Sequence, residues 1–297
     1  MGYLDTGSVR LWYDVRGEGF PVLFIHGGFA GLGYRLQPRS YEWLDEFAPH
    51  YRAVVYHRRG CGWSSLPGDG GWSLSAQVAD ALAIMDALGL EQAHVIGSSA
   101  GGPIALLLAL EHPQRVRSLA LANTAAALFP VESDRAVTAV VRQELETLRR
   151  EGPLALLHRR PLEARVSLAA LWERPAAERD GRLEEWQAGY RQLAQQAAAS
   201  LGEKEWARLC AAEVENIAAY LDVDLRPRLS EVRAPAIVVH GDADRVVPLA
   251  WGRELAQMLP AAELAVVSGA PHGILGVSAE ARRLVLEFFR RVDSRLG

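Results

Sequence analysis

The stretch Ala93-His94-Val95-Ile96-Gly97-Ser98-Ser99-Ala100-Gly101-Gly102 decides the fold. Its first four residues form a short run that predicts a strand, and the apolar spacing of residues 102–110 predicts a helix directly after it. Between them stands a G-x-S-x-G pattern centred on Ser99. Strand, sharp turn and helix in this order make a nucleophile elbow, which lifts the serine hydroxyl off the sheet edge. The glycines at 97 and 101 let the strand and helix backbones approach closely, because a Cβ at either position would clash.

The sequence on either side of this stretch predicts a parallel sheet. Strand signals alternate with helical ones in the first 124 residues and again after residue 234. The predicted strands cover residues 9–15, 21–26, 52–56, 93–96, 116–123, 235–240 and 263–267. The predicted helices cover residues 77–88, 102–110, 249–259 and 278–292. Apolar strands alternating with helices are typical of a parallel sheet covered on both faces, so we expect the α/β class.

The pattern changes between residues 125 and 230. Strand signals are missing there, and an Ala-, Leu-, Arg- and Glu-rich composition predicts helices. We expect these helices to break at Pro130, Gly152-Pro153, Pro161, Pro175, Gly181 and Gly202. The expected organisation is therefore an α/β core, residues 1–124 and 231–297, with an all-helical insertion, residues 125–230. Its aromatic residues, usually core at helical spacing, are candidates for shaping an apolar pocket: Trp172, Trp186, Tyr190 and Trp206.

A serine hydroxyl is a poor nucleophile near neutral pH and needs a neighbouring base, which a carboxylate can orient. His272 stands in the loop after the strand predicted at 263–267. Asp242 and Asp244 stand in the loop after the strand predicted at 235–240. Active sites of open parallel sheets form at the C-terminal ends of strands, so Ser99, His272 and one aspartate are expected to meet. The residues alone leave the choice of aspartate open.

Attack on a carbonyl places negative charge on its oxygen, and two backbone amides should receive that charge. One is expected from Ala100, the residue after the serine. The other is expected from the loop His26-Gly27-Gly28-Phe29, with Gly28 as the candidate and Phe29 as the fallback. His26 is expected to shape this loop and not to act as a second base.

Five stretches together resemble the α/β-hydrolase fold superfamily, nearest its serine esterase, non-haem haloperoxidase and lactonase group. They are His26-Gly27-Gly28, Arg59-Gly60-Cys61-Gly62-Trp63-Ser64, Gly97–Gly102, Gly241–Pro248 and Gly269–Gly273. The resemblance implies the chain order Ser, Asp, His and makes Asp244 the acid, which leaves Asp242 to brace its loop. It also implies a helical cap after the sixth core strand. The implied function is cofactor-free hydrolysis of a small carboxylic ester through an acyl-enzyme.

Departures from the family pattern narrow this expectation. Gly28-Phe29 lacks the proline that accompanies peroxidative activity, and Ala100 replaces the tryptophan of proline-type aminopeptidases. Gly273 replaces the tryptophan that often follows the histidine in carbon–carbon bond hydrolases. A lactonase, a carbon–carbon bond hydrolase, a proline-type aminopeptidase and a non-catalytic ligand-binding protein of this fold remain alternatives. His57 stands where relatives carry aspartate, for a reason the sequence does not give, and Cys61 is expected to be a small buried thiol.

Composition excludes several other classes. The chain has 297 residues, with 32 basic and 36 acidic side chains, so no basic excess favours a nucleic-acid partner. Lys204, between Glu203 and Glu205, is the only lysine, which excludes a Walker A loop and argues against Schiff-base chemistry. No apolar run is long enough to span a membrane, and no pattern indicates a metal or dinucleotide site.

Two cysteines and no visible signal peptide predict a reducing, cytoplasmic location. The expected partner is a small-molecule acyl substrate, with no cofactor, nucleic acid or membrane. The sequence does not indicate the oligomeric state.

Overall fold

The computed structural model describes residues 1–68, 71–129 and 135–296. Within these residues the core is one eight-stranded sheet in the order β1-β2-β4-β3-β5-β6-β7-β8. The strands are β1 (Gly2–Asp5), β2 (Arg10–Arg16), β3 (Pro21–Ile25), β4 (Arg52–Tyr56), β5 (Ala93–Ser98), β6 (Val116–Ala122), β7 (Ala236–Gly241) and β8 (Ala262–Val267). β1 and β2 pair antiparallel, as do β2 and β4, and all ladders from β4 to β8 are parallel. The predicted α/β class with a mostly parallel sheet is confirmed.

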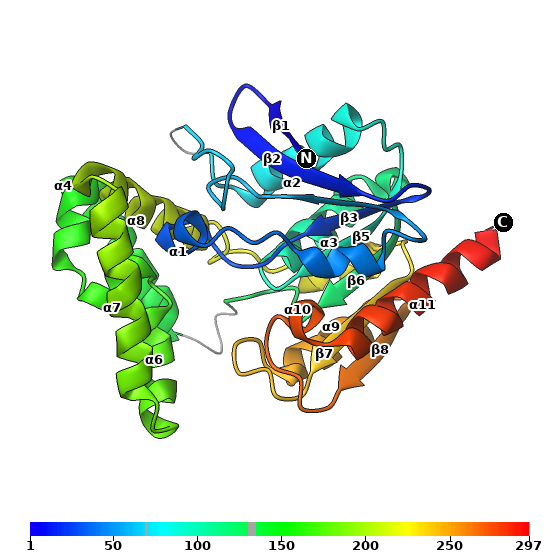
Figure 1. Cartoon of the computed structure of the whole chain (residues 1–297). Coiled ribbons are helices and arrows are strands. Elements are labelled where there is room, and N and C mark those ends of the chain that lie inside the picture. Colours follow the sequence, from blue (N-terminus) through cyan, green and yellow to red (C-terminus); the bar gives the residue numbers. More distant parts are fainter. Residues whose placement is uncertain (69–70, 130–134, 297) are drawn as a thin grey trace.

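Helices cover both faces of the sheet (Figure 1). One face carries α2 (Leu74–Ala87), α3 (Gly101–Glu111) and α9 (Leu249–Met258), and the other carries η1 (Glu42–Glu46), α10 (Ile274–Val277) and α11 (Ala279–Leu296). Alternate residues of each strand serve the two faces: in β3, Leu23 packs toward the first set and Phe24 toward the second. Because both faces are buried, the central strands are mostly apolar, which is why their positions could be predicted.

The turn between β5 and α3 is tightly enclosed. Ser99 has a φ of 49°, a left-handed conformation that residues with a side chain rarely adopt. A Cβ on Gly101 would lie less than 3.0 Å from the backbone oxygen of Ile25, and one on Gly97 would lie 2.7 Å from the Cβ of Ala105. The glycines that the elbow pattern predicted are therefore required by the contact of α3 with β3 and β5.

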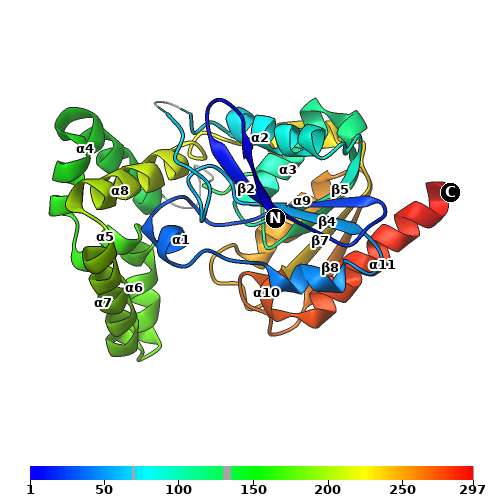
Figure 2. The ribbon, with the colours of Figure 1, turned by 45° about the horizontal axis from the view of Figure 1, so that its top comes forward.

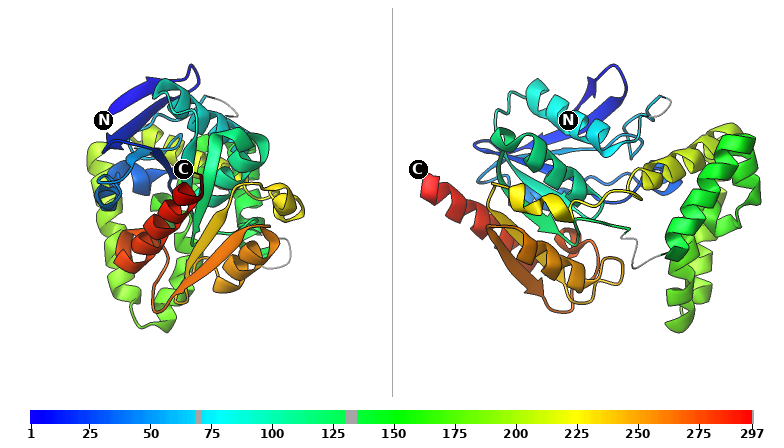
Figure 3. Two further views of the ribbon diagram at one scale, coloured as in Figure 1. Left: turned by 90° about the vertical axis from the view of Figure 1, so that its right-hand side faces the viewer. Right: turned by 180° about the vertical axis from the view of Figure 1, so that it is seen from behind.

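The five α-helices described between β6 and β7 lie outside the sheet layers. They are α4 (Arg135–Arg159), α5 (Leu162–Val166), α6 (Ala170–Arg179), α7 (Leu183–Ser200) and α8 (Glu203–Ala218), followed by the short η3 (Arg226–Glu231). They form an arm on the side of the core opposite the C-terminus (Figures 1 and 2). Figure 3 shows the molecule with the C-terminal end of α11 toward the viewer on the left and from behind on the right. No helix in the described ranges is both long and apolar enough to cross a membrane.

Breaks within the arm follow the predicted positions with one exception. α4 is interrupted at Gly152, whose φ is 83°, directly before Pro153. The break predicted at Pro175 is wrong, because this proline lies inside α6. Pro175 is exposed, so water can satisfy the carbonyl that its missing N–H leaves free. Pro130 lies outside the described residues.

The arm is fixed to the segment that follows β3. Leu32, in the short α1 (Leu32–Leu36), packs in one cluster with Val166 and Leu209 of the arm. The amide of Ala30 donates a 2.9 Å hydrogen bond to Asn216 of α8. At the far tip, Asp180 and Arg245 form an exposed ion pair of 2.7 Å. Apolar packing therefore holds the arm near α1, since an exposed pair contributes little.

A buried histidine ties the last helix to the sheet. His94 of β5 is fully buried, bonds Ser118 of β6 at 2.7 Å and contacts Asp293 of α11 at 3.2 Å. Its ring stacks on Phe289 with a centroid distance of 4.3 Å. Burial lowers the pKa of His94 to about 4, although Asp293 opposes this shift.

The close contacts of Gly101 at the elbow predict that one added methyl group there strongly reduces stability. Gly101→Ala should reduce the free energy of unfolding by about 3 kcal/mol or more, because the new Cβ meets the fixed backbone of β3. Gly189, in the exposed part of α7, has open space within 4 Å of the position that an added methyl group would take. Gly189→Ala should therefore gain about 0.5–1 kcal/mol from helix propensity. Urea unfolding of both variants measures this, and equal effects would contradict it.

The buried His94 predicts a loss of stability in acid. An unfolded histidine has a pKa near 6.5, so between pH 6.5 and about 4 the unfolded chain binds a proton that folded His94 does not. Stability contributed by neutral His94 is present above pH 6.5 and falls as the pH drops through this window. Melting temperatures measured from pH 7 to pH 4.5 should fall less steeply in His94→Gln. The exposed His50 gives the control His50→Gln, which should keep the wild-type slope.

Candidate active site

Three predicted residues meet where parallel strands end. Ser99 follows β5, Asp244 follows β7, and His272 follows β8. The Oγ of Ser99 lies 3.0 Å from Nε2 of His272, and Nδ1 of His272 lies 2.8 Å from Oδ2 of Asp244. If the carboxylate is ionised, Nδ1–H donates to it, and Nε2 is left to accept the serine proton. The arrangement can therefore generate a nucleophilic alkoxide without a metal or cofactor.

The Asp244 carboxylate is held ionised by its partners. Burial raises its pKa, but the hydrogen bond and charge of His272 and the amides of Val247 and Val246 outweigh burial, so the net pKa lies below its ordinary value. Those two amides donate to Oδ1 at 2.9 and 2.8 Å. Oδ1 is thus occupied by the backbone, and Oδ2 is directed at the imidazole.

Asp242 occupies a different position from Asp244. Its side chain is exposed and accepts a 2.6 Å hydrogen bond from the amide of Gly269. It therefore joins the loop after β7 to the loop after β8 and has no hydrogen bond to His272 among the described residues. The sequence alone left open which of the two aspartates partners His272. In the structure they have distinct surroundings, and only Asp244 contacts the imidazole among the described residues.

Asn123 is a site residue that the sequence analysis missed. Its side chain donates to Oδ2 of Asp244, and its Oδ1 accepts a 3.2 Å hydrogen bond from the amide of Ile274. Its φ of 46° is left-handed, which asparagine tolerates better than most residues. A polar residue directly after the apolar strand β6, next to the elbow strand, was the available signal. Asn123 links the acid to the segment that carries His272.

The loop expected to complete the oxyanion hole lies against the serine. A Cβ on Gly27 would lie 2.7 Å from the Cβ of Ser99, so only glycine allows this approach. Gly28 has a φ of 77°, which also requires glycine. In the described part of the chain, the amides of Ala100, Gly28 and Phe29 donate no hydrogen bond. All three candidate amides therefore have no hydrogen-bond partner in the described part of the chain.

The orientation of the peptide between Ser99 and Ala100 is fixed by a hydrogen bond to its carbonyl. The hydroxyl of Thr124 donates to the carbonyl of Ser99 at 2.7 Å. Since the N–H and C=O of a trans peptide point in opposite directions, this bond turns the Ala100 amide away from Thr124. Thr124 is fully buried and was not singled out by the sequence.

The peptide between Gly27 and Gly28 is fixed in the same way. Its carbonyl accepts from the hydroxyl of Tyr34 at 2.8 Å and contacts Nδ1 of His26 at 2.7 Å. Nε2 of His26 accepts from the backbone amide of Arg58 at 3.0 Å. Burial, followed by the charge of Arg58, holds the pKa of His26 well below its ordinary value, so the ring is neutral. His26 shapes this loop.

His57 performs a bracing role that an aspartate could not. Its Nε2–H donates to the carbonyl of Arg39 at 2.9 Å, and its Nδ1 accepts from the amide of Trp63 at 3.0 Å. Burial lowers its pKa to about 4, so it is neutral and can do both. A carboxylate has no proton for the Arg39 carbonyl. Cys61 is fully buried, as expected, and burial raises the pKa of its thiol.

A second hydrogen-bonded set of the same residue types is unsuited to catalysis. Ser118, His94 and Asp293 are in contact, but Ser118 and His94 are fully buried in the sheet. No substrate can reach this serine. In the described ranges, no group of three or more His, Cys, Asp or Glu side chains is placed to hold a metal ion.

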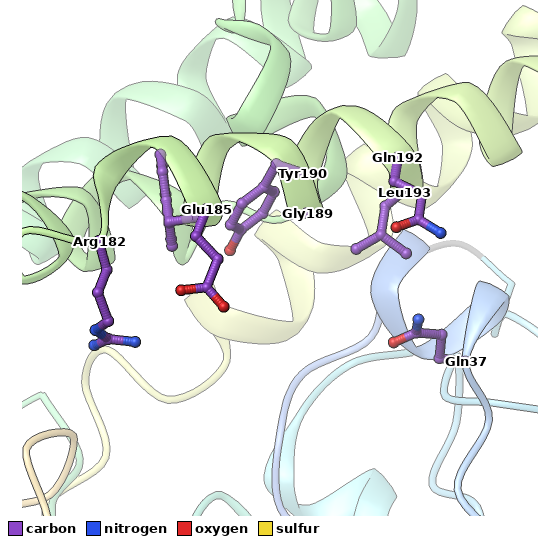
Figure 4. A pocket seen from close by; sticks show the side chains of 8 residues that line it. Gln37, Arg182, Glu185, Gly189, Tyr190, Gln192 and Leu193 are labelled. Carbon is purple, nitrogen blue, oxygen red and sulfur yellow. The ribbon is translucent and has the colours of Figure 1, made fainter.

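A groove of about 460 Å³ separates the arm from the segment after α1 (Figure 4). It is lined by Gln37 on one side and by residues 182–193 of the arm on the other, including Trp186 and Tyr190. The triad residues do not line it, so it is not the space over Ser99. Trp206 instead donates to the carbonyl of Arg165 inside the arm. The side chain of Trp172 lies outside the described part of the structure.

Comparisons with known proteins place the chain in a family and match its fold. A family model described as the alpha/beta hydrolase fold matches residues 21–279. The 2-hydroxymuconate semialdehyde hydrolase of Pseudomonas putida is 31% identical over 287 residues, covering 94% of this chain and 90% of that protein. The crystal structure of the enol-lactonase from Burkholderia xenovorans LB400 has a TM-score of 0.65 at 23% identity, covering 99% and 100%. The meta-cleavage product hydrolase from Pseudomonas fluorescens IP01 has a TM-score of 0.64 at 24% identity, covering 95% of each. The two structures support the fold alone.

The different surroundings of the two aspartates predict different mutant effects. Asp244→Asn should lower kcat by about 10³–10⁴-fold, because an amide cannot hold the imidazole in the required tautomer or offset its charge. Asp242→Asn should change kcat only a few-fold, since its contact is with the Gly269 amide. Steady-state hydrolysis of an activated aryl ester measures both. The reverse ranking would overturn the assignment of the acid.

Proposed function

Because the chain belongs to the α/β hydrolase fold family, we propose that this hydrolase is a cofactor-free serine hydrolase that cleaves small carboxylic esters. The observation that carries the proposal is the continuous chain of contacts from Ser99 through His272 to Asp244 beside unoccupied backbone amides. Hydrolysis with a nucleophile, a base, an orienting acid and oxyanion donors needs no further group. The proposal is also supported by the charge states of the buried groups, since His26 and His57 are neutral and Asp244 is ionised.

Acylation begins when Oγ of Ser99 attacks the ester carbonyl carbon and Nε2 of His272 takes the serine proton. Asp244 remains ionised and offsets the charge of the imidazolium. The tetrahedral intermediate collapses, the carbon–oxygen bond to the alcohol breaks, and the leaving oxygen takes the proton from His272. In the second half, His272 takes a proton from water, and the resulting hydroxide attacks the acyl carbon. Collapse releases the carboxylic acid and returns the proton to Ser99.

The negative oxygen of each tetrahedral intermediate is assigned to the amides of Ala100 and Gly28, with Phe29 as the fallback. Each donor contributes about 3 kcal/mol to the barrier reduction when it is held in place before reaction. The bonds from Thr124 and Tyr34 to the neighbouring carbonyls support this assignment, because they leave the amides little freedom.

An exposed apolar side chain next to the acid supports an apolar substrate group. Val246, whose amide donates to Asp244, is 60% exposed. An exposed apolar residue beside a site favours an apolar ligand surface. We assign the acyl or alcohol portion of a small-molecule ester to the surface at Val246. The free, buried thiols of Cys61 and Cys210 support a reducing, cytoplasmic location.

A second candidate activity is hydrolysis of a carbon–carbon bond. It is favoured by the 31% identity to a protein named for hydrolysis of 2-hydroxymuconate semialdehyde. Gly273 after His272 argues against it, since the family resemblance associates tryptophan at this position with such enzymes. The same triad could serve either substrate, so the discrimination must come from a panel of substrates.

Covalent labelling and a substrate panel test the proposal. A fluorophosphonate probe should label the wild type at Ser99 and leave Ser99→Ala unlabelled. Aryl esters should be hydrolysed with an initial burst of the released phenol, which marks an acyl-enzyme. The same enzyme is then assayed with lactones, amino-acid anilides and 2-hydroxymuconate semialdehyde.

Three outcomes would overturn the proposal. Equal labelling of the wild type and Ser99→Ala would reject Ser99 as the nucleophile. A kcat/KM for the semialdehyde at least about 10³-fold above that for every ester would favour the second candidate, because such a ratio exceeds what a single hydrophobic pocket contact supplies. Turnover of none of these substrates, with no labelling, would favour a non-catalytic protein.

A further inference from the structure

Arg58 is a fully buried cation without a carboxylate partner. It follows β4 closely, and only 1% of its surface is exposed. Within the described residues, no acidic oxygen lies within 4.0 Å of its guanidinium, whereas its neighbour Arg59 pairs with Asp80 at 2.7 Å. The two arginines and one aspartate leave this buried region with a net positive charge.

Burying an unpaired charge is expensive, and its cost is only partly recovered by neutral partners. The guanidinium donates to Oε1 of Gln77 at 2.8 Å, to the hydroxyl of Tyr220 at 2.8 Å, and to the carbonyl of Gly28. An apolar side chain of similar length would fill the space without this desolvation. The position therefore calls for an explanation beyond packing.

Two of these three partners connect to the two loops that carry the oxyanion amides. Gly28 is in the loop after β3. The hydroxyl of Tyr220, in turn, donates to the carbonyl of Ala100 at 2.9 Å. One guanidinium and one phenol thus join the loop after β3 to the serine elbow. The third partner, Gln77 of α2, contacts Arg58 and Tyr220 but neither loop among the described contacts.

We propose that Arg58 is a positioning residue of the oxyanion hole, which with Tyr220 fixes the Gly28 loop relative to Ala100 and places a positive charge behind both. This inference rests on the proposed function, because it assumes that a tetrahedral oxyanion forms at these amides. Arg58 touches no reacting atom. It acts through the two carbonyls that it and Tyr220 hold.

The physical effect has two parts. The Gly28 carbonyl and the Phe29 amide belong to one peptide, so a cation on the carbonyl polarises that peptide and strengthens the N–H of Phe29, the fallback donor. For the Gly28 amide the bond acts by holding the loop in position. The charge itself stabilises negative charge that is absent from the bound ester and appears only in the transition state. Stabilisation confined to the transition state raises kcat and leaves KM nearly unchanged.

Tyr220 also connects the arm to the Arg58 guanidinium. It lies two residues after the end of α8, the last long helix of the arm. Its ring packs edge-on against Phe29 with a centroid distance of 5.4 Å. The segment that returns from the arm to the core therefore contacts the oxyanion loop and the elbow at once.

The experiment compares Arg58→Met and Tyr220→Phe with a matched control, Gln77→Met. Arg58→Met should lower kcat for an aryl ester by about 10²–10³-fold, as for the loss of an oxyanion donor, with KM changed less than about twofold. Tyr220→Phe, which keeps the cation and removes one hydroxyl, should lower kcat about fivefold. Gln77→Met removes an Arg58 bond without touching either loop and should leave kcat near wild type. The double variant should lose less kcat than the product of the two single effects, because Arg58 reaches the elbow through Tyr220.

A trifluoromethyl ketone, which forms a tetrahedral oxyanion on serine, separates positioning from loss of structure. Its inhibition constant should rise by the same factor as kcat/KM falls, while circular dichroism and KM stay constant. Equal loss of kcat in Gln77→Met, or unchanged kcat and inhibition in both Arg58→Met and Tyr220→Phe, would overturn the inference. If Arg58→Met does not fold, Tyr220→Phe decides alone.

The rate of fluorophosphonate labelling keeps this test separate from the proposed function. Labelling needs the activated serine and the oxyanion amides but no knowledge of the natural substrate. Absence of labelling in the wild type would reject the proposed function and the inference with it. Wild-type labelling with an unchanged rate in both variants would reject the inference alone.

Discussion

The left-handed turn at Ser99 is the constraint on which the rest of this structure depends. Holding a residue with a side chain at a φ of 49° costs on the order of 1–3 kcal/mol, and the surrounding structure must supply it. It does so by pressing α3 against β3 and β5, where Gly97 and Gly101 leave no room for a Cβ. The same closeness brings Gly27 within contact of Ser99. Catalytic geometry and core packing are therefore one arrangement.

Buried polar groups organise the catalytic edge around this turn. His26 and His57 are neutral and each joins two backbone segments, whereas Asp244 is ionised and takes two amides and the imidazole. Arg58 carries a charge into the same layer, with no carboxylate beside it among the described residues. Since each such bond links loops from different strands, the edge is held by polar contacts as well as by the apolar core.

Local patterns predicted the elements of the core closely. The strand expected at 52–56 is β4, and the helix expected at 102–110 is α3 with one more residue at each end. These predictions succeed because burial on both faces and the elbow glycines act over a few residues. The break expected at Pro175 fails for the opposite reason, since the cost of proline in a helix depends on solvent access that the local sequence does not record.

By itself the sequence determined the order of strands and helices, the elbow with its required glycines, and the residues that could act as nucleophile and base. Only the tertiary structure decided which partners surround them. The bond from Asn123 to Asp244 spans 121 residues and that from Tyr220 to Ala100 spans 120. The bond from Arg58 to the Gly28 carbonyl likewise joins the ends of two different strands. No local pattern encodes such contacts, because they depend on where the sheet order and the returning arm bring separate strand ends together.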